Sequence, residues 1–162
     1  MESSKKILDA LDSLRIKYEH YTHAPVIDVL ERFSMNLSFD GCVCKNLLIT
    51  TRNEARFLLC MLPAEKDADL KAMRDQFKTA RLCFAGTDAL ARLLDQVPGS
   101  VGVLSVINDT SGVVEIVLDS SLENAPRIAM HPGVNTETVV MSGQELARFI
   151  GENGRVLHYF DF

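Results

Sequence analysis

Lys45 is the residue whose surroundings in the sequence most suggest chemistry. It lies in the segment Cys42-Val-Cys-Lys45-Asn46-Leu-Leu-Ile49, beside the polar Asn46 and at the mouth of a strongly apolar predicted strand. A lysine at the end of a buried strand can project a cation and three hydrogen-bond donors into a cleft. The alternative is a lysine at a sheet edge, whose stem packs on apolar surface while its ammonium remains in water. The sequence leaves both interpretations open.

The segment that begins at His131 is the second candidate. Its sequence is His131-Pro-Gly133-Val-Asn135-Thr136, so the histidine is followed by a stiff turn. Asn135 and Thr136 add hydrogen-bond donors and acceptors close to the imidazole. The alternative is a histidine that lies in a turn and binds nothing. Asn108 follows an apolar run and is most simply part of a hairpin turn.

Four basic side chains recur at spacings of three, four and three residues, namely Lys71, Arg74, Lys78 and Arg81. Their segment is predicted to be helical, so much of this set would lie on one helix face. A basic face can contact the phosphates of a nucleic acid. The alternative is a solvated helix face on which Asp67 pairs with Lys71 one turn later.

The cysteines and histidines do not form a zinc-binding pattern. The Cys-x-Cys pair at Cys42 and Cys44 and the His-x-x-His pair that starts at His20 lack the spacing of structural zinc sites, and no second pair completes four ligands. We therefore expect neither a metal nor another cofactor. The four cysteines fit reduced thiols better than a disulfide framework. Cys60 and Cys83 fall in predicted apolar strands and are expected in the core.

The composition is that of one globular domain spanning residues 1–162, with 47% hydrophobic and 24% charged residues. The net charge is −5, and residues 101–162 hold three basic against eight acidic side chains, which disfavours indiscriminate nucleic-acid binding. A basic face on the first two thirds of the chain remains open. No apolar run reaches the ~18 residues of a membrane span, and the first residues do not resemble a signal peptide. We expect a cytoplasmic protein without membrane contact.

Hydrophobic periodicity and turn residues predict the elements that must position these side chains. Helices are expected from Ser3 or Ser4 through Leu14, over Asp28–Phe33, over Asp67–Lys78, after a cap at Thr87 or Asp88, and after the capping box Ser142-Gly-Gln-Glu145. Strands are expected at Lys17–Tyr21, Asn46–Thr51, Arg56–Leu62, Arg81–Phe84, Val101–Ile107, Val113–Leu118, Val139–Met141 and Arg155–Phe160. Strands in hairpins interrupted by single helices indicate an α+β fold with a mostly antiparallel or mixed sheet. Glycine-rich nucleotide-binding motifs are absent from the sequence, which argues against a nucleotide-fold enzyme.

Five short segments, in order along nearly the whole chain, match the motifs of one protein family. They are His23-Ala-Pro25-Val26, Lys45-Asn46-Leu47, Pro98-Gly-Ser-Val101 followed by Val106-Ile-Asn108-Asp109, Val117-Leu-Asp119 with Leu122, and His131-Pro132 followed by Asn135-Thr136-x-Thr138. The first three correspond to His-Pro-Pro-Val, Lys-Asn-Leu and Pro-Gly-Ser-Val…Leu-Leu-Asn-Asp in the family. On these segments the chain resembles the YbaK/prolyl-tRNA synthetase-associated editing-domain family, in particular its free-standing, ProX-like branch of Ala-tRNA(Pro) deacylases.

The resemblance implies a fold and a reaction. The fold would be a mixed, largely antiparallel curved sheet or barrel-like core with flanking helices. The reaction would be hydrolysis, in trans, of the ester between a mischarged amino acid and the 3′-terminal ribose of tRNA, without a covalent enzyme nucleophile. Lys45 would hold the phosphate–ribose end or stabilise the carbonyl oxygen as charge develops. Asn46 would orient the ester or the water, and His131 would line the pocket.

The resemblance also implies the residues that contact the substrate. An apolar wall would exclude side chains larger than alanine. That wall would be formed by Val26 and Leu30, and further substrate contacts would come from Ser105, Asn108, Gly133 and Asn135. The charge distribution, independently of the resemblance, favours a tRNA contact at Lys71, Arg74, Lys78 and Arg81, and the alternative is the set Lys5, Lys6, Arg15 and Lys17. The expected partners are the acceptor end of mischarged tRNA and, as a further candidate, prolyl-tRNA synthetase, with the chain a monomer or weak homodimer.

The chain departs from the family pattern at two places. Val43 stands where the family often has a histidine, and Gly102-Val-Leu-Ser105 replaces the usual Thr-Pro-Phe-Gly. Both segments lie near the amino-acid pocket of relatives, so the identity of the amino acid stays open. The alternatives are a deacylase for cysteinyl- or seryl-tRNA and a non-catalytic tRNA-binding or regulatory module.

Overall fold

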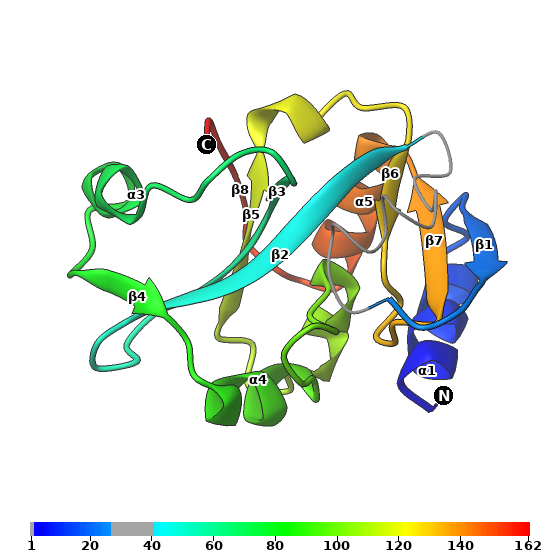
Figure 1. Ribbon diagram of the computed structural model, residues 1–162, viewed down its shortest axis with the longest axis horizontal. Helices are drawn as coiled ribbons and strands as arrows, with labels where there is room; N and C mark the ends of the chain where they lie inside the picture. The colour runs from blue at the N-terminus through cyan, green and yellow to red at the C-terminus, as the bar shows by residue number, and fades with distance from the viewer. Residues whose placement is uncertain (1, 27–40) are drawn as a thin grey trace.

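The computed structural model describes residues 2–26 and 41–162, and within them eight strands form a mixed sheet flanked by helices (Figure 1). The strands are β1 (Glu19–Thr22), β2 (Cys42–Thr51), β3 (Phe57–Pro63), β4 (Leu82–Phe84), β5 (Val114–Asp119), β6 (Ile128–Met130), β7 (Glu137–Met141) and β8 (Leu157–Phe160). The helices are α1 (Glu2–Ser13), α3 (Leu70–Phe77), α4 (Thr87–Leu94) and α5 (Gly143–Glu152), with the 3₁₀ helices η1 (Val103–Asn108) and η2 (Ser120–Leu122). The prediction of an α+β fold with a mixed sheet is confirmed.

Strand β2 joins the two parts of the sheet. The strand order is β1-β7-β6-β2-β3-β5-β8, and β4 also pairs with β2. One edge of β2 pairs along its length with antiparallel β3. Its other edge pairs with parallel β6 at Cys42 and Val43 and with antiparallel β4 at Ile49–Thr51. β2 therefore meets two different strands on the same edge, one at each end.

The sheet separates two apolar cores. The larger core lies between the sheet and the helices α1, α4, α5 and η1, with Leu59, Ile116 and Phe149 fully buried in it. The smaller core lies on the other face, where α3 inserts Met73 against Val117 and neighbouring residues. Figure 1 shows α3 well apart from α1, α4 and α5. All seven residues of β3 are buried, which explains its unbroken apolar sequence.

The expected strand at Val101–Ile107 is wrong, because this segment forms η1 after Gly102. Val103, Leu104, Ser105 and Val106 are consecutive and all buried, rather than alternating between two faces. A short apolar run of this kind is compatible with either a buried strand or a buried helical turn. The hairpin expected between this segment and β5 is therefore absent.

Three helix boundaries also differ from the prediction. α1 begins at Glu2, so Ser4 lies inside the helix, and its hydroxyl donates to Glu137 instead of capping. The N-cap of α4 is Gly86, which has no side chain to act as a cap. α3 runs only from Leu70 to Phe77 after an Asp69 cap. The N-cap expected at Ser142 is confirmed, since its hydroxyl accepts from the Glu145 amide, but the Glu145 carboxylate accepts from the Lys17 amide and from Arg148 instead of completing the capping box.

Other expectations are also corrected or fall outside the structure. The short strand β6 was missed, and it matters because it joins β2 to β7. Cys83 is exposed on β4 rather than buried, whereas Cys60 is fully buried as expected. The helix expected over Asp28–Phe33 lies outside the described residues.

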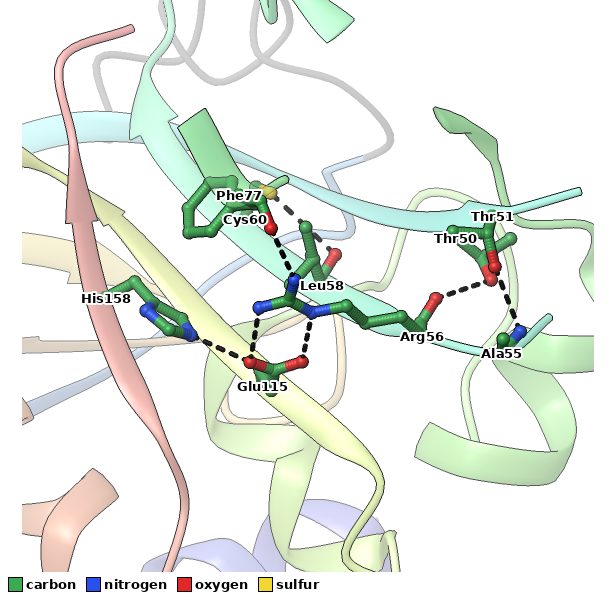
Figure 2. A network of polar contacts seen from close by, with 9 residues as sticks. All are labelled: Thr50, Thr51, Ala55, Arg56, Leu58, Cys60, Phe77, Glu115 and His158. Carbon is green, nitrogen blue, oxygen red and sulfur yellow. Dashed lines mark hydrogen bonds and ion pairs between the residues drawn. The ribbon is translucent and has the colours of Figure 1, made fainter. Parts of the chain in front are cut away.

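A network of charged side chains connects the start of β3 with β5 and β8 on the side of the sheet that carries the smaller core (Figure 2). Arg56, just before β3, donates from Nε and Nη2 to the Glu115 carboxylate at 2.7 and 3.0 Å, and from Nη1 to the Phe77 carbonyl at 3.0 Å. His158 on β8 lies 2.8 Å from the same carboxylate and packs edge-on against the Phe77 ring. Hydrogen bonds from Arg56, with a further contribution from His158, hold the pKa of Glu115 below its ordinary value, while burial acts in the opposite direction.

This network predicts a pH-dependent stability. A carboxyl whose pKa is lower in the folded state stabilises the fold above its unfolded pKa, and this contribution is lost as the pH falls through the folded value. Glu115→Gln should therefore lower the free energy of unfolding near neutral pH, and its difference from wild type should shrink as the pH drops below the ordinary value of 4.5. Urea midpoints at neutral and acidic pH measure this. Glu152→Gln, an exposed change on α5, is the control. An equal loss at both pH values in Glu115→Gln would contradict the interpretation.

Candidate active site

Lys45 and Asn46 are consecutive residues of β2 and therefore lie on opposite faces of the sheet. Leu48 on this strand packs into the larger core and Ile49 into the smaller one, so alternation assigns Asn46 to the larger-core face and Lys45 to the α3 face. The pairing with β3 continues without a break from Cys44 to Thr50. The prediction that the two side chains act together therefore requires a substrate that reaches both faces.

Lys45 is a half-buried cation near the start of β2. Its side chain is 26% exposed, and its Nζ lies 3.5 Å from Oδ1 of Asp67, which is fully exposed. An ion pair this long with a solvated carboxylate contributes little to stability. The Asp67–Lys71 pair expected from the sequence is not formed, since Asp67 precedes the helix. Lys45 is thus held loosely and can exchange Asp67 for another anion.

Asn46 carries a buried polar atom without a partner. Its Oδ1 is inaccessible to solvent, and it accepts no hydrogen bond within the described part of the chain. Burying an acceptor unpaired costs free energy, so such atoms call for an explanation, such as a ligand or an ordered water. Ser105, fully buried in η1, has an unpartnered hydroxyl in the same described residues.

At Asn46, one edge of β2 is not paired with any strand among residues 2–26 and 41–162. Cys42 N donates to Arg127 O on the β6 side, and Leu48 O accepts from Ala85 N on the β4 side. Backbone groups of alternate residues point to the same edge of a strand. The Asn46 backbone therefore faces this edge between β6 and β4, where no described strand pairs with it.

His131 follows β6 directly and lies against the start of η1. Its Nδ1 is 3.2 Å from the Glu137 carbonyl oxygen. A Cβ added to Gly102 would stand 2.9 Å from the His131 carbonyl oxygen, closer than two such atoms normally approach. Gly102 therefore permits the contact between η1 and the His131 loop. The sequence analysis noted Gly102 only as a departure from the family pattern, and nothing in the sequence signals this close approach.

The structure brings Val26 next to Asn135. The Val26 amide donates to the Asn135 carbonyl at 2.9 Å, and the His23 amide donates to the Thr136 carbonyl at 2.9 Å. The His23 ring adds a contact of 2.8 Å between Nε2 and the Thr138 hydroxyl. Val26 is buried, as a residue of an apolar wall would be. Two motifs that are far apart in the sequence thus meet, whereas Leu30 lies outside the described residues.

Asn108 and Gly133, two predicted substrate-binding residues, contact other parts of the fold. The Asn108 side chain donates from Nδ2 to the Leu94 carbonyl at 2.9 Å and accepts from Lys6 at 2.8 Å, so it joins α1 to the end of α4. Gly133 has φ +86, and a Cβ there would lie 3.1 Å from Ile7. Their predicted role in substrate binding stays a prediction.

The four predicted tRNA-binding side chains do not share one helix face. Lys71 and Arg74 lie on α3, but Lys78 is its left-handed C-cap and Arg81 lies just before β4. Lys71, Arg74 and Arg81 nevertheless line, with Leu70 and Leu82, a shallow pocket of about 420 Å³. We call these three the α3 basic cluster. It belongs to the same face of the sheet as Lys45.

The sequence profile of the aminoacyl-tRNA editing domain matches residues 29–149, most of the chain. The chain belongs to the aminoacyl-tRNA editing domain family. One relative of this editing domain, the prolyl-tRNA editing protein ProX of Acetoanaerobium sticklandii, is 29% identical over 95% of this chain and 94% of its own length. The prolyl-tRNA synthetase associated domain-containing protein 1 of Danio rerio is 27% identical over 91% of this chain and 81% of its own.

The fold of the editing domain agrees with a solved structure. The crystal structure of a candidate trans-editing enzyme for prolyl-tRNA synthetase superposes with a TM-score of 0.72 over 98% of this chain and 96% of that one, at 12% identity. Within residues 2–26 and 41–162 the editing domain has no group of three or more histidine, cysteine or acidic side chains placed to hold a metal ion. No helix in the described ranges is long and apolar enough to cross a membrane.

Proposed function

We propose that this editing domain is a trans-acting deacylase that hydrolyses the ester of mischarged tRNA(Pro), with alanine as the preferred amino acid. The family assignment and the similarity to ProX over nearly the full length of both chains support an aminoacyl-tRNA hydrolase. The choice of tRNA(Pro) rests on the names of the two relatives, and the choice of alanine on the ProX-like motifs described above.

The buried Asn46 Oδ1 without a described partner, next to a stretch of β2 that no described strand pairs on this edge, is the observation that supports the mechanism. An acceptor 3′ end that lies across this edge of β2 can contact Asn46 from the larger-core face and Lys45 from the α3 face. The buried Asn46 Oδ1 would then accept from the substrate or from the attacking water, which relieves the cost of its unpaired burial. A single substrate end thereby uses two side chains that point in opposite directions.

Lys45 supplies the charge in this mechanism. As water attacks the ester carbonyl, negative charge develops on the carbonyl oxygen, and a nearby ammonium stabilises it. Lys45 can instead hold the terminal phosphate–ribose, giving up its weak contact with Asp67. Ester hydrolysis needs little assistance to the leaving ribose oxygen, so no side chain has to form a covalent intermediate. His131 lines the pocket on the side of η1.

In this proposal the choice of alanine would come from a small apolar pocket beside Val26. Val26 is buried beside the Asn135 backbone, where it can form part of a wall that rejects side chains larger than a methyl group. Each additional methylene changes discrimination only by about 10–200-fold, so steric exclusion of proline has to provide most of the selectivity. Ser105 lies fully buried in the segment that departs from the family pattern, and its unpartnered hydroxyl would favour a polar group or a water there.

A panel of mischarged tRNAs tests the proposal. We expect hydrolysis of Ala-tRNA(Pro) and little of Pro-tRNA(Pro), with Ser- and Cys-tRNA as competing substrates. Preferential hydrolysis of one of those would replace alanine, while absence of hydrolysis with retained tRNA binding would identify a non-catalytic module. Sedimentation with and without prolyl-tRNA synthetase tests the expected partner and the expected monomer or weak homodimer.

The α3 basic cluster is the proposed contact for the tRNA backbone. Reversing Arg74 and Arg81 to glutamate should raise KM for tRNA and leave kcat nearly unchanged, because these side chains would contact phosphates rather than the ester. The salt slope of binding should also become shallower by roughly 0.9 per lost phosphate contact. The matched control reverses Lys5 and Lys17 to glutamate, on and just after α1. A rise in KM in the control alone would place the tRNA on the α1 side.

A further inference from the structure

Cys42 and Cys44 form a close thiol pair at the start of β2. Their sulfur atoms lie 3.7 Å apart, on the same side of the strand, with Val43 between them. Cys42 is half-buried and Cys44 is 7% exposed. None of the four cysteines, all of which lie in the described residues, is joined in a disulfide. The next residue after the pair is Lys45.

The pair combines an accessible sulfur with a nearby second one. The hydrogen bond with the Cys44 thiol lowers the pKa of Cys42, although burial and the carboxylates of Glu65 and Asp119 act in the opposite direction. A lower pKa gives more thiolate, which is the form that oxidants attack. Cys44 is then placed to react with the oxidised Cys42.

The other two cysteines cannot take part in this reaction. Cys60 is fully buried in the smaller core, on the opposite face from Cys44, and its burial raises the pKa of its thiol. Cys83 is exposed but pairs with Thr50 at the far end of β2. Six residues of extended strand span about 20 Å, far beyond the reach of a disulfide.

We propose that Cys42 and Cys44 are a peroxide-sensitive redox site that closes to a disulfide and switches off the adjacent editing site. The Cys42 thiolate attacks one oxygen of hydrogen peroxide, which forms a sulfenic acid and releases water after protonation. The Cys44 sulfur then attacks the Cys42 sulfur, forming the S–S bond and releasing a second water. The two sulfurs lose two electrons and the peroxide gains them.

Formation of the Cys42–Cys44 disulfide would distort β2 immediately before Lys45 and Asn46. Residues two apart in a strand have Cα atoms about 6.6 Å apart, at the upper limit that a disulfide spans, so the backbone around Val43 has to contract. Val43 pairs with Ala129 of β6, and its carbonyl accepts from the Ala64 amide. Contraction there shifts the peptide that leads into Lys45 and Asn46. A misplacement of about 1 Å can cost about 10²-fold in rate.

Mass spectrometry of the full chain tests the redox site without reference to its activity. The reduced protein is exposed to hydrogen peroxide, its remaining thiols are alkylated under denaturing conditions, and its intact mass and peptides are measured. We expect two fewer alkylated cysteines per chain than in the reduced control, with the missing pair mapping to a Cys42–Cys44 bond that dithiothreitol reverses. Cys83→Ser should behave like wild type, whereas Cys42→Ser and Cys44→Ala should form no such bond. Sulfinic acid at Cys42, or dimers through Cys83 in place of the internal bond, would overturn the proposal.

Deacylation measured on the same samples tests the switch. Peroxide should lower kcat/KM of wild type and of Cys83→Ser by at least about tenfold, with recovery in dithiothreitol, and leave folded Cys42→Ser unaffected. A disulfide that forms without loss of activity, or a loss that persists in Cys42→Ser, would refute the switch. If the reduced wild type hydrolyses no mischarged tRNA, the proposed function fails, while the mass measurement still decides whether the redox site exists.

Discussion

Lys45→Ala is expected to lower kcat/KM for Ala-tRNA(Pro) by about 10²–10³-fold while leaving the fold intact. The loss follows from removing the cation beside the developing negative charge. Stability should hardly change, because the side chain is partly exposed and its ion pair with Asp67 is long. Turnover at several tRNA concentrations, together with the melting temperature, measures both effects.

Whether kcat or KM changes in Lys45→Ala distinguishes the two roles considered for Lys45. A fall in kcat with unchanged KM indicates stabilisation of the carbonyl oxygen, whereas a rise in KM indicates a contact with the phosphate–ribose end. Lys45→Arg should keep part of the activity, because it retains the charge but replaces the compact ammonium by a planar fork. Lys5→Ala removes an exposed lysine from α1 and is the control. Full activity of a folded Lys45→Ala protein would refute the mechanism.

Gly143→Ala is expected to lower the free energy of unfolding by about 3 kcal/mol or to prevent folding. Gly143 is the first residue of α5 and lies against the end of η2. A Cβ at this position would stand 1.8 Å from the Leu122 carbonyl oxygen and 2.9 Å from that of Glu123. The backbone has to move apart to admit a methyl group, which would separate α5 from the sheet. Urea unfolding measures the effect.

Gly151→Ala in the same helix is the matched control. A Cβ at Gly151 meets nothing within 4 Å, so the only expected effect is the better helix propensity of alanine. That change should raise stability by about 0.5–1 kcal/mol. Equal effects of the two substitutions would show that helix propensity, rather than the contact with Leu122, determines the outcome at Gly143.

Helices and strands are predicted well where the local sequence pattern agrees with the position of the element in the folded core. β5 combines β-branched residues with a buried position, and α5 begins after the N-cap expected at Ser142. η1 was missed because its consecutive apolar residues satisfy a buried helical turn as well as a strand. β6 has three residues, and only its pairing with β2 and β7 identifies it as a strand.

The candidate site could be predicted in part. The motif residues were identified, and the contacts of Val26 with Asn135 and of His23 with Thr138 show that two distant motifs meet. The sequence did not indicate that Lys45 and Asn46 face opposite sides, because that depends on where β2 begins and on an unbroken register. The basic set failed as a helix face because α3 ends at Phe77, where Lys78 turns the chain.

The pairing of β1 with β7 delays part of the fold while the chain is being synthesised. His20 pairs with Val139, so β1 acquires its neighbour only after the chain through β7 has left the ribosome. The contacts that hold Val26 beside Asn135 are delayed in the same way. Pairings this distant in sequence carry a large loop-closure cost and form slowly. A nascent chain in which β7 is not yet available therefore lacks the contacts that place Val26 beside Asn135.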